Sequence, residues 1–268
     1  IVPVNPMLLR DELRHAVEDS GATVALCAQE LLPELTPLLQ TGSLGRIIVS
    51  CYADYLGEQR EGLPDWLLAS RADQVDARIT CWRDALGAKQ APSSHLAGSD
   101  DLACLLYTSG TTGKPKGAIR SHEASTLMAY ATAMEMGFTK DDKALLVMPL
   151  CHANSLYFAN TFMHLGACIV VDDSVSFDPA RVMNWLSTQG ITFTSLVPTH
   201  YIMMLALPEA VKARYDVSAV GKLMISSAPA RRETKLAILE YFRNGQLYEL
   251  YGSTEAGWVT LLRPQDQL

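Results

Sequence analysis

The segment from Leu105 to Gly117, LLYTSGTTGKPKG, combines the side chains needed to hold a polyphosphate. An apolar run leads into a stretch rich in glycine, hydroxyl residues and lysine. Glycines let backbone N–H groups approach phosphate oxygens, hydroxyls donate hydrogen bonds to them, and lysines supply positive charge. We therefore predict a phosphate-binding loop between a strand and a helix, formed by Thr108, Ser109, Gly110, Thr111, Thr112, Gly113, Lys114 and Lys116.

This loop differs from two familiar nucleotide-binding loops. The motif G-x-x-x-x-G-K-[ST] needs Ser or Thr after its lysine to hold magnesium, whereas Lys114 is followed by Pro115. The glycine spacing also fails to match the dinucleotide motif G-x-G-x-x-G. A plain polar surface loop is the alternative, but so much Gly and Thr after a buried strand costs conformational entropy that only a ligand would offset.

A second segment, Tyr248–Gly257 with the sequence YELYGSTEAG, carries complementary chemistry. Tyr251 offers a flat face on which adenine can stack, and Gly252 lets the backbone approach a nucleotide closely. Thr254 can donate to the α-phosphate, while Glu255 is a hard carboxylate suited to magnesium. Tyr251 alone could equally be a core aromatic, but its neighbours favour a site because site residues occur together.

Both segments resemble signatures of one family. Tyr107–Gly117 is similar to the phosphate-binding signature of the adenylate-forming superfamily, which contains acyl-CoA synthetases, luciferases and nonribosomal-peptide adenylation domains. Tyr248–Gly257 resembles the family's second signature, aromatic-Gly-x-Thr-Glu, in the right order downstream. The resemblance covers nearly all of the chain. It implies an α/β fold, with mainly parallel sheets flanked by helices, and the central part of the family's N-terminal AMP-binding domain.

Two weaker segments gain meaning from this resemblance. Met148–Ser155, MPLCHANS, is similar to a family segment in which His152 lies where the ATP and acyl pockets meet. Ser226–Pro229, SSAP, resembles the turn that lines adenine, although the family often has Gly where Ser227 stands. The resemblance implies that the catalytic residues are Thr108, His152, Thr254 and Glu255. It implies that Glu255 and Thr108 hold magnesium. The nucleotide would contact the phosphate-binding loop and also Ser227, Ala228, Pro229, Tyr251, Gly252, Ser253 and Thr254.

The resemblance implies an ATP-dependent, AMP-forming acid–thiol ligase of fatty acid metabolism, with ATP, Mg²⁺ and coenzyme A as cofactors and co-substrates. A carboxylic acid attacks the α-phosphorus of ATP, pyrophosphate leaves, and coenzyme A then displaces AMP from the acyl-AMP. Transfer to a carrier-protein thiol or an amine stays open, as does a non-catalytic nucleotide-binding module. The acid also stays open between a fatty acid, a small branched or aromatic acid and a carnitine-like zwitterion, because the candidate pocket residues are of mixed polarity: Asn154, Tyr157, Phe158, Pro198 and Thr199.

The family pattern continues with an Asp for the ribose, a hinge and a small domain that bears a catalytic Lys, and none of these is recognised within the 268 residues. We therefore expect these residues alone to adenylate poorly, since one electrostatic stabiliser is absent. Exposed sheet edges favour self-association as a homo-oligomer.

Apolar β-rich runs alternate with helical patterns, which favours a parallel sheet covered by helices. The turn-rich segment 87–100 is expected to divide the chain into subregions 1–98 and 99–268. Asp178 followed by Pro179 predicts a helix start, and Gly21 and Gly190 predict helix ends. The expected strands are 23–28, 46–51, 102–107, 143–147, 167–172, 192–197, 222–226 and 246–250, and the clearest expected helices are 8–19, 121–136, 178–188 and 231–243.

Composition limits the partners. The net charge is −7 and the basic residues are scattered, so nucleic acid is not expected as a partner. No apolar run reaches the roughly 20 residues that span a bilayer, and the N-terminus has no basic signal-peptide region. Six widely spaced cysteines, mostly in apolar runs, indicate reduced, buried thiols in a cytoplasmic protein.

Overall fold

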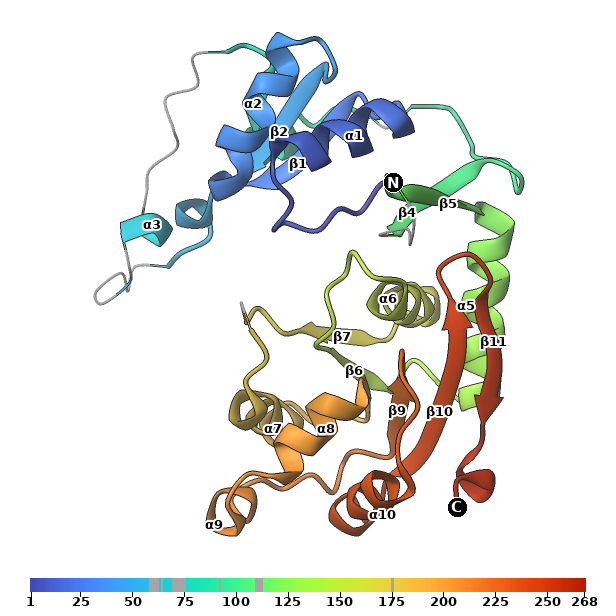
Figure 1. The fold of residues 1–268 in the computed structure, drawn as a ribbon. Coiled ribbons are helices and arrows are strands. Elements are labelled where there is room, and N and C mark those ends of the chain that lie inside the picture. The colour runs from blue at the N-terminus through green and yellow to red at the C-terminus, as the bar shows by residue number, and fades with distance from the viewer. Residues whose placement is uncertain (58–62, 64, 69–75, 92, 109–112, 175) are drawn as a thin grey trace. The chain divides into compact units, whose positions relative to one another are not determined.

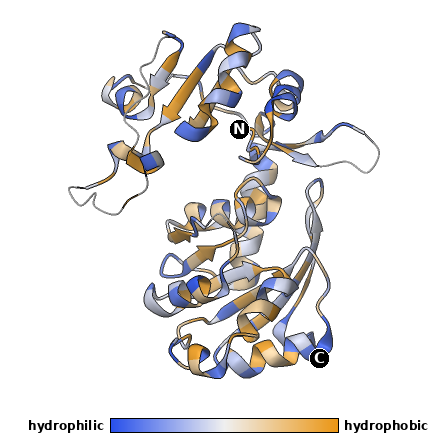
Figure 2. Cartoon of the chain, turned by 60° about the vertical axis from the view of Figure 1, so that its left-hand side comes forward, coloured by the Kyte–Doolittle hydropathy of each residue, from blue (hydrophilic) through white to orange (hydrophobic). Residues whose placement is uncertain are grey.

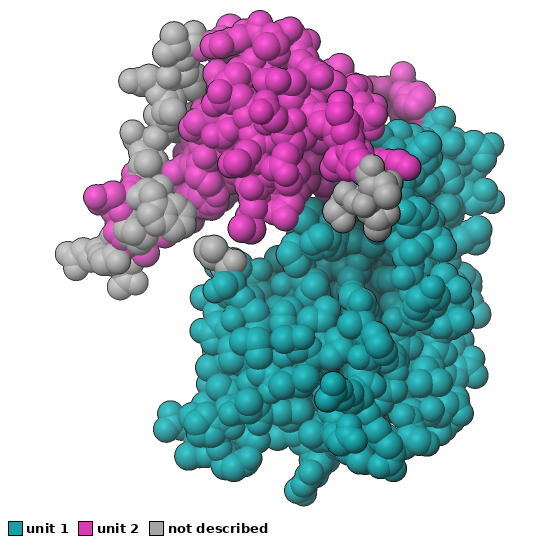
Figure 3. All heavy atoms as spheres, viewed as in Figure 1, with its two compact units in different colours: residues 1, 98–108, 118–268 teal, residues 2–97, 109–117 magenta. Residues whose placement is uncertain are grey.

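The computed structural model describes residues 1–57, 63, 65–68, 76–91, 93–108, 113–174 and 176–268. The chain forms two compact units (Figure 3). Unit 1 comprises Ile1, Gly98–Thr108 and Ala118–Leu268, and unit 2 comprises Val2–Ala97 and Ser109–Gly117.

Unit 1 is built on a six-stranded sheet in the order β11-β10-β9-β8-β6-β7 (Figure 1). The strands from β7 to β10 run parallel, and β11 pairs antiparallel with β10 as the second arm of a hairpin. This α/β architecture confirms the expected fold class. The strands are β6 (Lys143–Leu146), β7 (Cys168–Val171), β8 (Phe193–Leu196), β9 (Lys222–Ser226), β10 (Gln246–Ser253) and β11 (Gly257–Leu262).

Helices cover both faces of this sheet because its strands alternate apolar residues between the faces. Leu223 and Ile225 of β9 point into one core, with α7, α8 and α10, while Met224 points into the other, with α5 and α6. Figure 2 shows apolar residues along the sheet strands. The helices of unit 1 are α5 (His122–Met136), α6 (Ala153–Leu165), α7 (Pro179–Thr188), α8 (Pro198–Leu205), the short α9 (Glu209–Lys212) and α10 (Arg232–Tyr241), followed by the 3-10 turn η3 (Pro264–Asp266).

Unit 2 contains a three-stranded parallel sheet in the order β1-β2-β3. Its core is formed by fully buried Leu38, Leu39 and Ile47 with their neighbours. The elements are α1 (Arg10–Ser20), β1 (Val24–Ala28), η1 (Gln29–Leu31), α2 (Leu32–Gln40), β2 (Arg46–Ser50), η2 (Tyr52–Asp54), α3 (Asp65–Leu68), β3 (Ile79–Cys81) and α4 (Trp82–Gly87).

Around the predicted phosphate loop the structure differs from the sequence expectation. The loop follows β4 (Leu102–Thr108), as expected, but leads into a strand, β5 (Lys116–Ser121), rather than directly into a helix. The strands β4 and β5 form a two-stranded sheet, so the loop is a connection between paired strands. Helix α5 begins only after Ser121, whose side chain accepts a hydrogen bond from the Ala124 N–H and caps the helix.

Elsewhere the expected elements are confirmed. All the strands expected from the sequence are present, and β10 extends three residues beyond its expected end at Leu250. The Asp178 carboxylate accepts hydrogen bonds from the backbone N–H groups of Ala180 and Arg181, which confirms the helix start. Gly21 and Gly190 adopt the left-handed backbone conformation expected where helices end.

The expectation of buried thiols is wrong for two of the six cysteines. All six cysteines are free thiols, but Cys168 is exposed and Cys151 is only half-buried. Cys168 begins β7, which is the edge strand of the large sheet and therefore has a neighbour on one side only. Among the described residues, no helix combines the length and apolar character that a membrane crossing requires.

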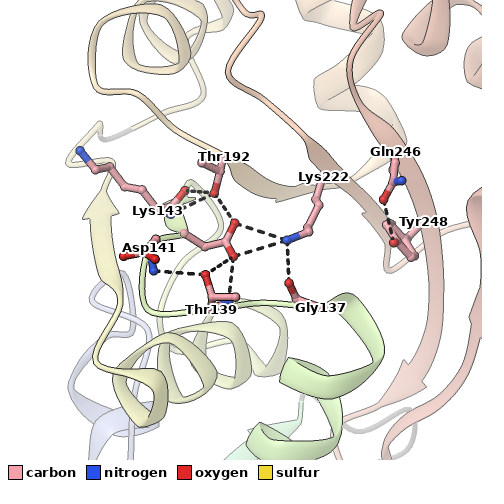
Figure 4. A network of polar contacts seen from close by, with 9 residues as sticks. Gly137, Thr139, Asp141, Lys143, Thr192, Lys222, Gln246 and Tyr248 are labelled. Carbon is pink, nitrogen blue, oxygen red and sulfur yellow. Dashed lines mark hydrogen bonds and ion pairs between the residues drawn. The ribbon is translucent and has the colours of Figure 1, made fainter.

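A polar cluster around Asp142 ties together the amino ends of β6, β8 and β9. Figure 4 shows the partners Thr139, Thr192 and Lys222 in this cluster. The Asp142 carboxylate accepts hydrogen bonds from the Thr139 N–H at 2.8 Å and from the Thr192 hydroxyl at 2.8 Å. Lys222 lies 3.4 Å away from it and donates to the Gly137 carbonyl at 3.0 Å. Burial by itself raises the pKa of Asp142, but these hydrogen bonds and the Lys222 charge outweigh burial and hold the pKa below its usual value.

We expect Asp142→Asn to lower the free energy of unfolding at pH 7 by about 1–3 kcal/mol, because it leaves a half-buried charged network incomplete. The pKa of Asp142 is lower in the folded state, so its stabilising charge acts above the unfolded value of roughly 3.9 and is lost as the pH falls through the folded pKa. Urea unfolding from pH 7 to acid should therefore show the difference shrinking. Asp141→Asn, at an exposed neighbour, is the control; an equal loss in both variants would contradict the prediction.

Candidate functional site

The candidate site lies at the carboxyl edge of the large sheet. The register pairs Ser226, the last residue of β9, with Leu250 of the adjacent parallel strand β10. The turn after β9 and the distal part of β10 therefore lie side by side. This edge is where ligands bind in open α/β sheets.

The turn after β9 has a conformation that favours glycine. Ser227 has φ +67°, one of two positive values among the described non-glycine residues. This left-handed geometry explains why glycine is often preferred at such a position. The turn is also held from the sheet, since the Ala230 N–H donates to Glu249 Oε1 at 3.1 Å. Glu249 in turn forms an ion pair with Lys235 of α10. Ser227, Ala228 and Pro229 are all exposed at this edge.

The second candidate segment forms the tip of the β10–β11 hairpin. Its register shifts between Tyr251 and Gly252, which marks a bulge. A Cβ on Gly252 would come within 2.3 Å of the Gly257 carbonyl oxygen, so a side chain there would force the two backbones apart. The Ala256 N–H donates to the Ser253 hydroxyl at 3.0 Å and closes the turn.

The tip presents polar and aromatic groups outward. Tyr251 is 69% exposed, and so offers its ring to a ligand rather than to the core. The exposed Glu255 carboxylate makes no hydrogen bond or ion pair within the described part of the chain. Thr254 is half-buried, and its carbonyl accepts a hydrogen bond from the Tyr157 hydroxyl at 3.1 Å. Mg²⁺ prefers hard oxygen ligands such as carboxylates, so the Glu255 carboxylate is a suitable ligand for it.

The predicted phosphate loop is only partly described. Ser109, Gly110, Thr111 and Thr112 lie outside the described residues. Thr108 ends β4 and is half-buried, whereas the side of the loop nearer to β5 is exposed. Within unit 2, His15 Nε2 donates to the Pro115 carbonyl at 2.8 Å and anchors that side of the loop. Gly113, Lys114 and Lys116 lie on this exposed side.

His152 lies after β6 at the same edge of the sheet, as the residue that precedes α6. It is exposed, and its side chain does not cap the helix. Two residues on, buried Asn154 donates to the hydroxyls of Ser195 at 3.0 Å and Ser226. The sequence analysis named Ser226 only as part of the predicted adenine turn and did not name Ser195, although alternation along β8 and β9 places both on the α6 face.

A cavity of about 550 Å³ lies between α5, α6 and the strands β9 to β11. Its volume is in the range of small-molecule sites. Of the pocket residues expected from the sequence, Phe158 lines this cavity, whereas Asn154, Tyr157, Pro198 and Thr199 do not. Pro198 and Thr199 begin α8, which packs on the other face of the sheet. The walls are largely apolar and include Leu127, Met128, Met136, Phe158, Trp258 and Leu261.

The polar groups at one end of this cavity are already paired. The Thr132 hydroxyl donates to the Met128 carbonyl and accepts a hydrogen bond from Trp258 Nε1 at 2.8 Å. Glu135 forms an ion pair with Arg263 at 2.6 Å. Arg120 also lines the cavity, and its Nε has no hydrogen-bond partner among the described residues. Away from Arg120, an apolar body is a better match for this cavity than a polar one.

Fold and site together define an α/β protein whose candidate ligand site lies at the carboxyl edge of a parallel sheet. The family described as "AMP-binding enzyme" matches residues 1–268. The chain is 32% identical over 257 residues to 4-coumarate-CoA ligase-like 2 of Arabidopsis thaliana, covering 96% of this chain and 43% of that protein. It is 30% identical over 255 residues to feruloyl-CoA synthase of an Amycolatopsis species, covering 95% and 44%.

The fold is also that of a solved structure, the inhibitor-bound N-terminal domain of FACL13 from Mycobacterium tuberculosis. The TM-score is 0.74 at 24% identity, covering 99% of this chain and 59% of that one. The chain belongs to the AMP-binding enzyme family. It spans less than half the length of the curated relatives that it matches.

Proposed function

We propose that the protein is an acyl-CoA ligase that activates a carboxylic acid with ATP. One oxygen of the acid attacks the α-phosphorus, pyrophosphate leaves, and an acyl-AMP forms. The thiol of coenzyme A then attacks the acyl carbonyl, and AMP leaves with the pair of electrons of its bond to the acyl group. The family membership supports the adenylating half of this reaction, and the relatives named as CoA ligases support the choice of thiol.

The observation that carries the proposal is the pairing of Ser226 with Leu250, which brings two candidate nucleotide-binding segments together. In the proposal, the Ser227–Pro229 turn lines the adenine and Tyr251 stacks on it, while Gly252 and Ser253 let the backbone approach. The Thr254 hydroxyl donates to the α-phosphate. The phosphate loop holds the polyphosphate through Thr108, Ser109, Gly110, Thr111, Thr112, Gly113, Lys114 and Lys116.

Magnesium fits this arrangement because the Glu255 carboxylate is exposed and uncommitted among the described residues. Glu255 would hold the ion, with the Thr108 hydroxyl as a second ligand. When bound, Mg²⁺ neutralises phosphate charge and so eases the departure of pyrophosphate. The protein's own residues supply positioning: His152 orients the acid's carboxylate, and Thr254 orients the α-phosphate.

We assign the body of the acid to the 550 Å³ cavity. Apart from Arg120, its walls are largely apolar, and they favour an acid with an alkyl or aromatic body over a small polar acid or a zwitterion, because an additional buried charge without a partner costs free energy. A cytoplasmic location is consistent with six free thiols.

The proposed function is tested by incubating the complete protein with ATP, Mg²⁺, coenzyme A and a panel of carboxylic acids. We expect AMP, pyrophosphate and one acyl-CoA in equal amounts, with the highest rates for apolar acids. Release of ADP, or a rate of AMP formation that no acid in the panel raises, would overturn the proposal.

The cavity assignment predicts a change in acid preference. Ala131 lines the cavity on α5, so Ala131→Phe should shorten the space for the acid's body. We expect kcat/KM for long acids to fall by about 10- to 100-fold relative to short ones, while KM for ATP stays unchanged. Thr126→Phe, an exposed position of α5 that does not line the cavity, is the control. An unchanged ratio between long and short acids would exclude this cavity as the acid site.

A further inference from the structure

Two side chains, one on β5 and one on α6, support the hairpin tip. The Tyr157 hydroxyl donates to the Thr254 carbonyl at 3.1 Å, and Arg120 Nη1 donates to the Glu255 carbonyl at 3.4 Å. The Arg120 guanidinium also lies over the Tyr157 ring, 5.0 Å from its centroid. Two successive carbonyls of the tip are thus held by two side chains that also hold each other.

Arg120 is unusual in its surroundings. It is only 6% exposed, and it has no carboxylate partner within the described part of the chain. Its Nε is buried and has no hydrogen-bond partner among the described residues. A buried cation without a counter-ion lowers the stability of the folded protein, and a hydrophobic residue of similar size would not carry this desolvation penalty. The guanidinium therefore has a specific role at this position, which is to contact the Tyr157 ring and the Glu255 carbonyl.

The tip itself has little freedom next to Arg120. Gly257 has φ +72°, and a Cβ there would lie 3.2 Å from both terminal nitrogens of Arg120 and 2.3 Å from Met128 Cε. Tyr157 is equally fixed, because it is buried and packs edge-on against Trp258 with ring centroids 5.2 Å apart. Burial raises the pKa of Tyr157, so its hydroxyl keeps the proton that it donates.

We propose that Arg120 and Tyr157 are positioning residues for adenylation: by holding the carbonyls of Thr254 and Glu255, they fix the directions of the side chains that meet the α-phosphate and magnesium. A peptide group is planar, so fixing a carbonyl fixes the whole plane and the Cα–Cβ directions on either side of it. Because the exposed carboxylate of Glu255 has no partner among the residues that the structure describes, its position depends on this backbone. The inference rests on the proposed function for its catalytic consequence, but not for the contacts themselves.

The contacts are tested by amide hydrogen exchange of the protein with Tyr157→Phe. This variant keeps the ring, and therefore the packing against Arg120 and Trp258, and removes only the hydroxyl. We expect the amides of Ser253–Ala256 to exchange about tenfold faster, while those of β6 and β8 are unchanged. Tyr130→Phe, at an exposed tyrosine of α5, is the control. Unchanged exchange at the tip, or an equal rise throughout unit 1, would overturn the proposal.

The catalytic consequence is tested in the complete protein by pyrophosphate exchange with Tyr157→Phe and Arg120→Lys. Misplacing Thr254 and Glu255 should lower kcat by about 10- to 100-fold and raise the Mg²⁺ concentration for half-maximal rate, with KM for the acid unchanged. A purely structural role would lower the amount of active protein without moving the Mg²⁺ dependence, and that result would overturn the proposal. If the parent protein itself shows no exchange, the proposed function fails, while the hydrogen-exchange result still decides whether the two residues hold the tip.

Discussion

Glu255→Ala is expected to lower the rate of pyrophosphate exchange by the complete protein by about 10²- to 10³-fold, comparable to removing one group that stabilises a transition state by electrostatics. The reason is that the exposed Glu255 carboxylate is the proposed magnesium ligand at the hairpin tip. AMP carries less phosphate charge than ATP and needs the ion less, so its affinity should change little. The measurements are exchange rates and AMP affinity for parent and variant.

Glu233→Ala is the matched control, because Glu233 is an exposed glutamate of the same unit on α10. It should leave both quantities unchanged. If Glu255→Ala keeps the parental rate, Glu255 is not the magnesium ligand. If the parent protein binds AMP and catalyses no exchange, the non-catalytic nucleotide-binding module becomes the better account.

Glu249→Gln is expected to lower the free energy of unfolding by about 3–5 kcal/mol, because it leaves Lys235 as a buried charge without its partner. Lys235 is 7% exposed and forms an ion pair with Glu249. Glutamine can still accept the hydrogen bond from the Ala230 N–H, so the variant isolates the loss of charge. Urea unfolding followed by circular dichroism measures the effect.

The control for this variant is Glu240→Gln, at an exposed position of the same helix, α10. It should change the free energy of unfolding by less than about 0.5 kcal/mol. Adding Lys235→Met to Glu249→Gln should recover part of the loss, since the unpaired cation is then removed. A loss below about 1 kcal/mol for Glu249→Gln would show that the pair contributes no more than a surface salt bridge does.

The elements that the sequence predicted best are those set by local chemistry. Asp178 caps α7 because its carboxylate reaches N–H groups two and three residues ahead, an interaction that short-range sequence encodes. The parallel strands of the large sheet were predicted because buried parallel strands are continuous apolar runs. The strands β3, β5 and β11 were missed. β3 is only three residues long. β5 pairs only with β4 in the described structure and β11 is the edge strand of the large sheet, and both carry exposed residues that interrupt the apolar pattern.

The part of the candidate site that consists of sequence motifs was predicted, and the part that depends on long-range packing was not. Tyr251 and Glu255 are recognisable from their spacing, and the structure adds that both are exposed at the same tip. The role of Arg120 was not predictable, because its burial depends on α6 and on a distant hairpin. Its partner Glu255, for example, lies 135 residues further along the chain. Tyr157 was expected in the pocket wall, and its hydroxyl contact likewise depends on long-range packing.

The central claim is that one nucleotide is held by two segments far apart in the chain. Its most direct test is hydrogen exchange of the protein with and without a non-hydrolysable acyl-AMP analogue. We predict that this single ligand slows exchange both in Thr108–Gly117 and in Tyr248–Gly257. Slower exchange in only one of these segments, or in neither at saturating ligand, would contradict the claim.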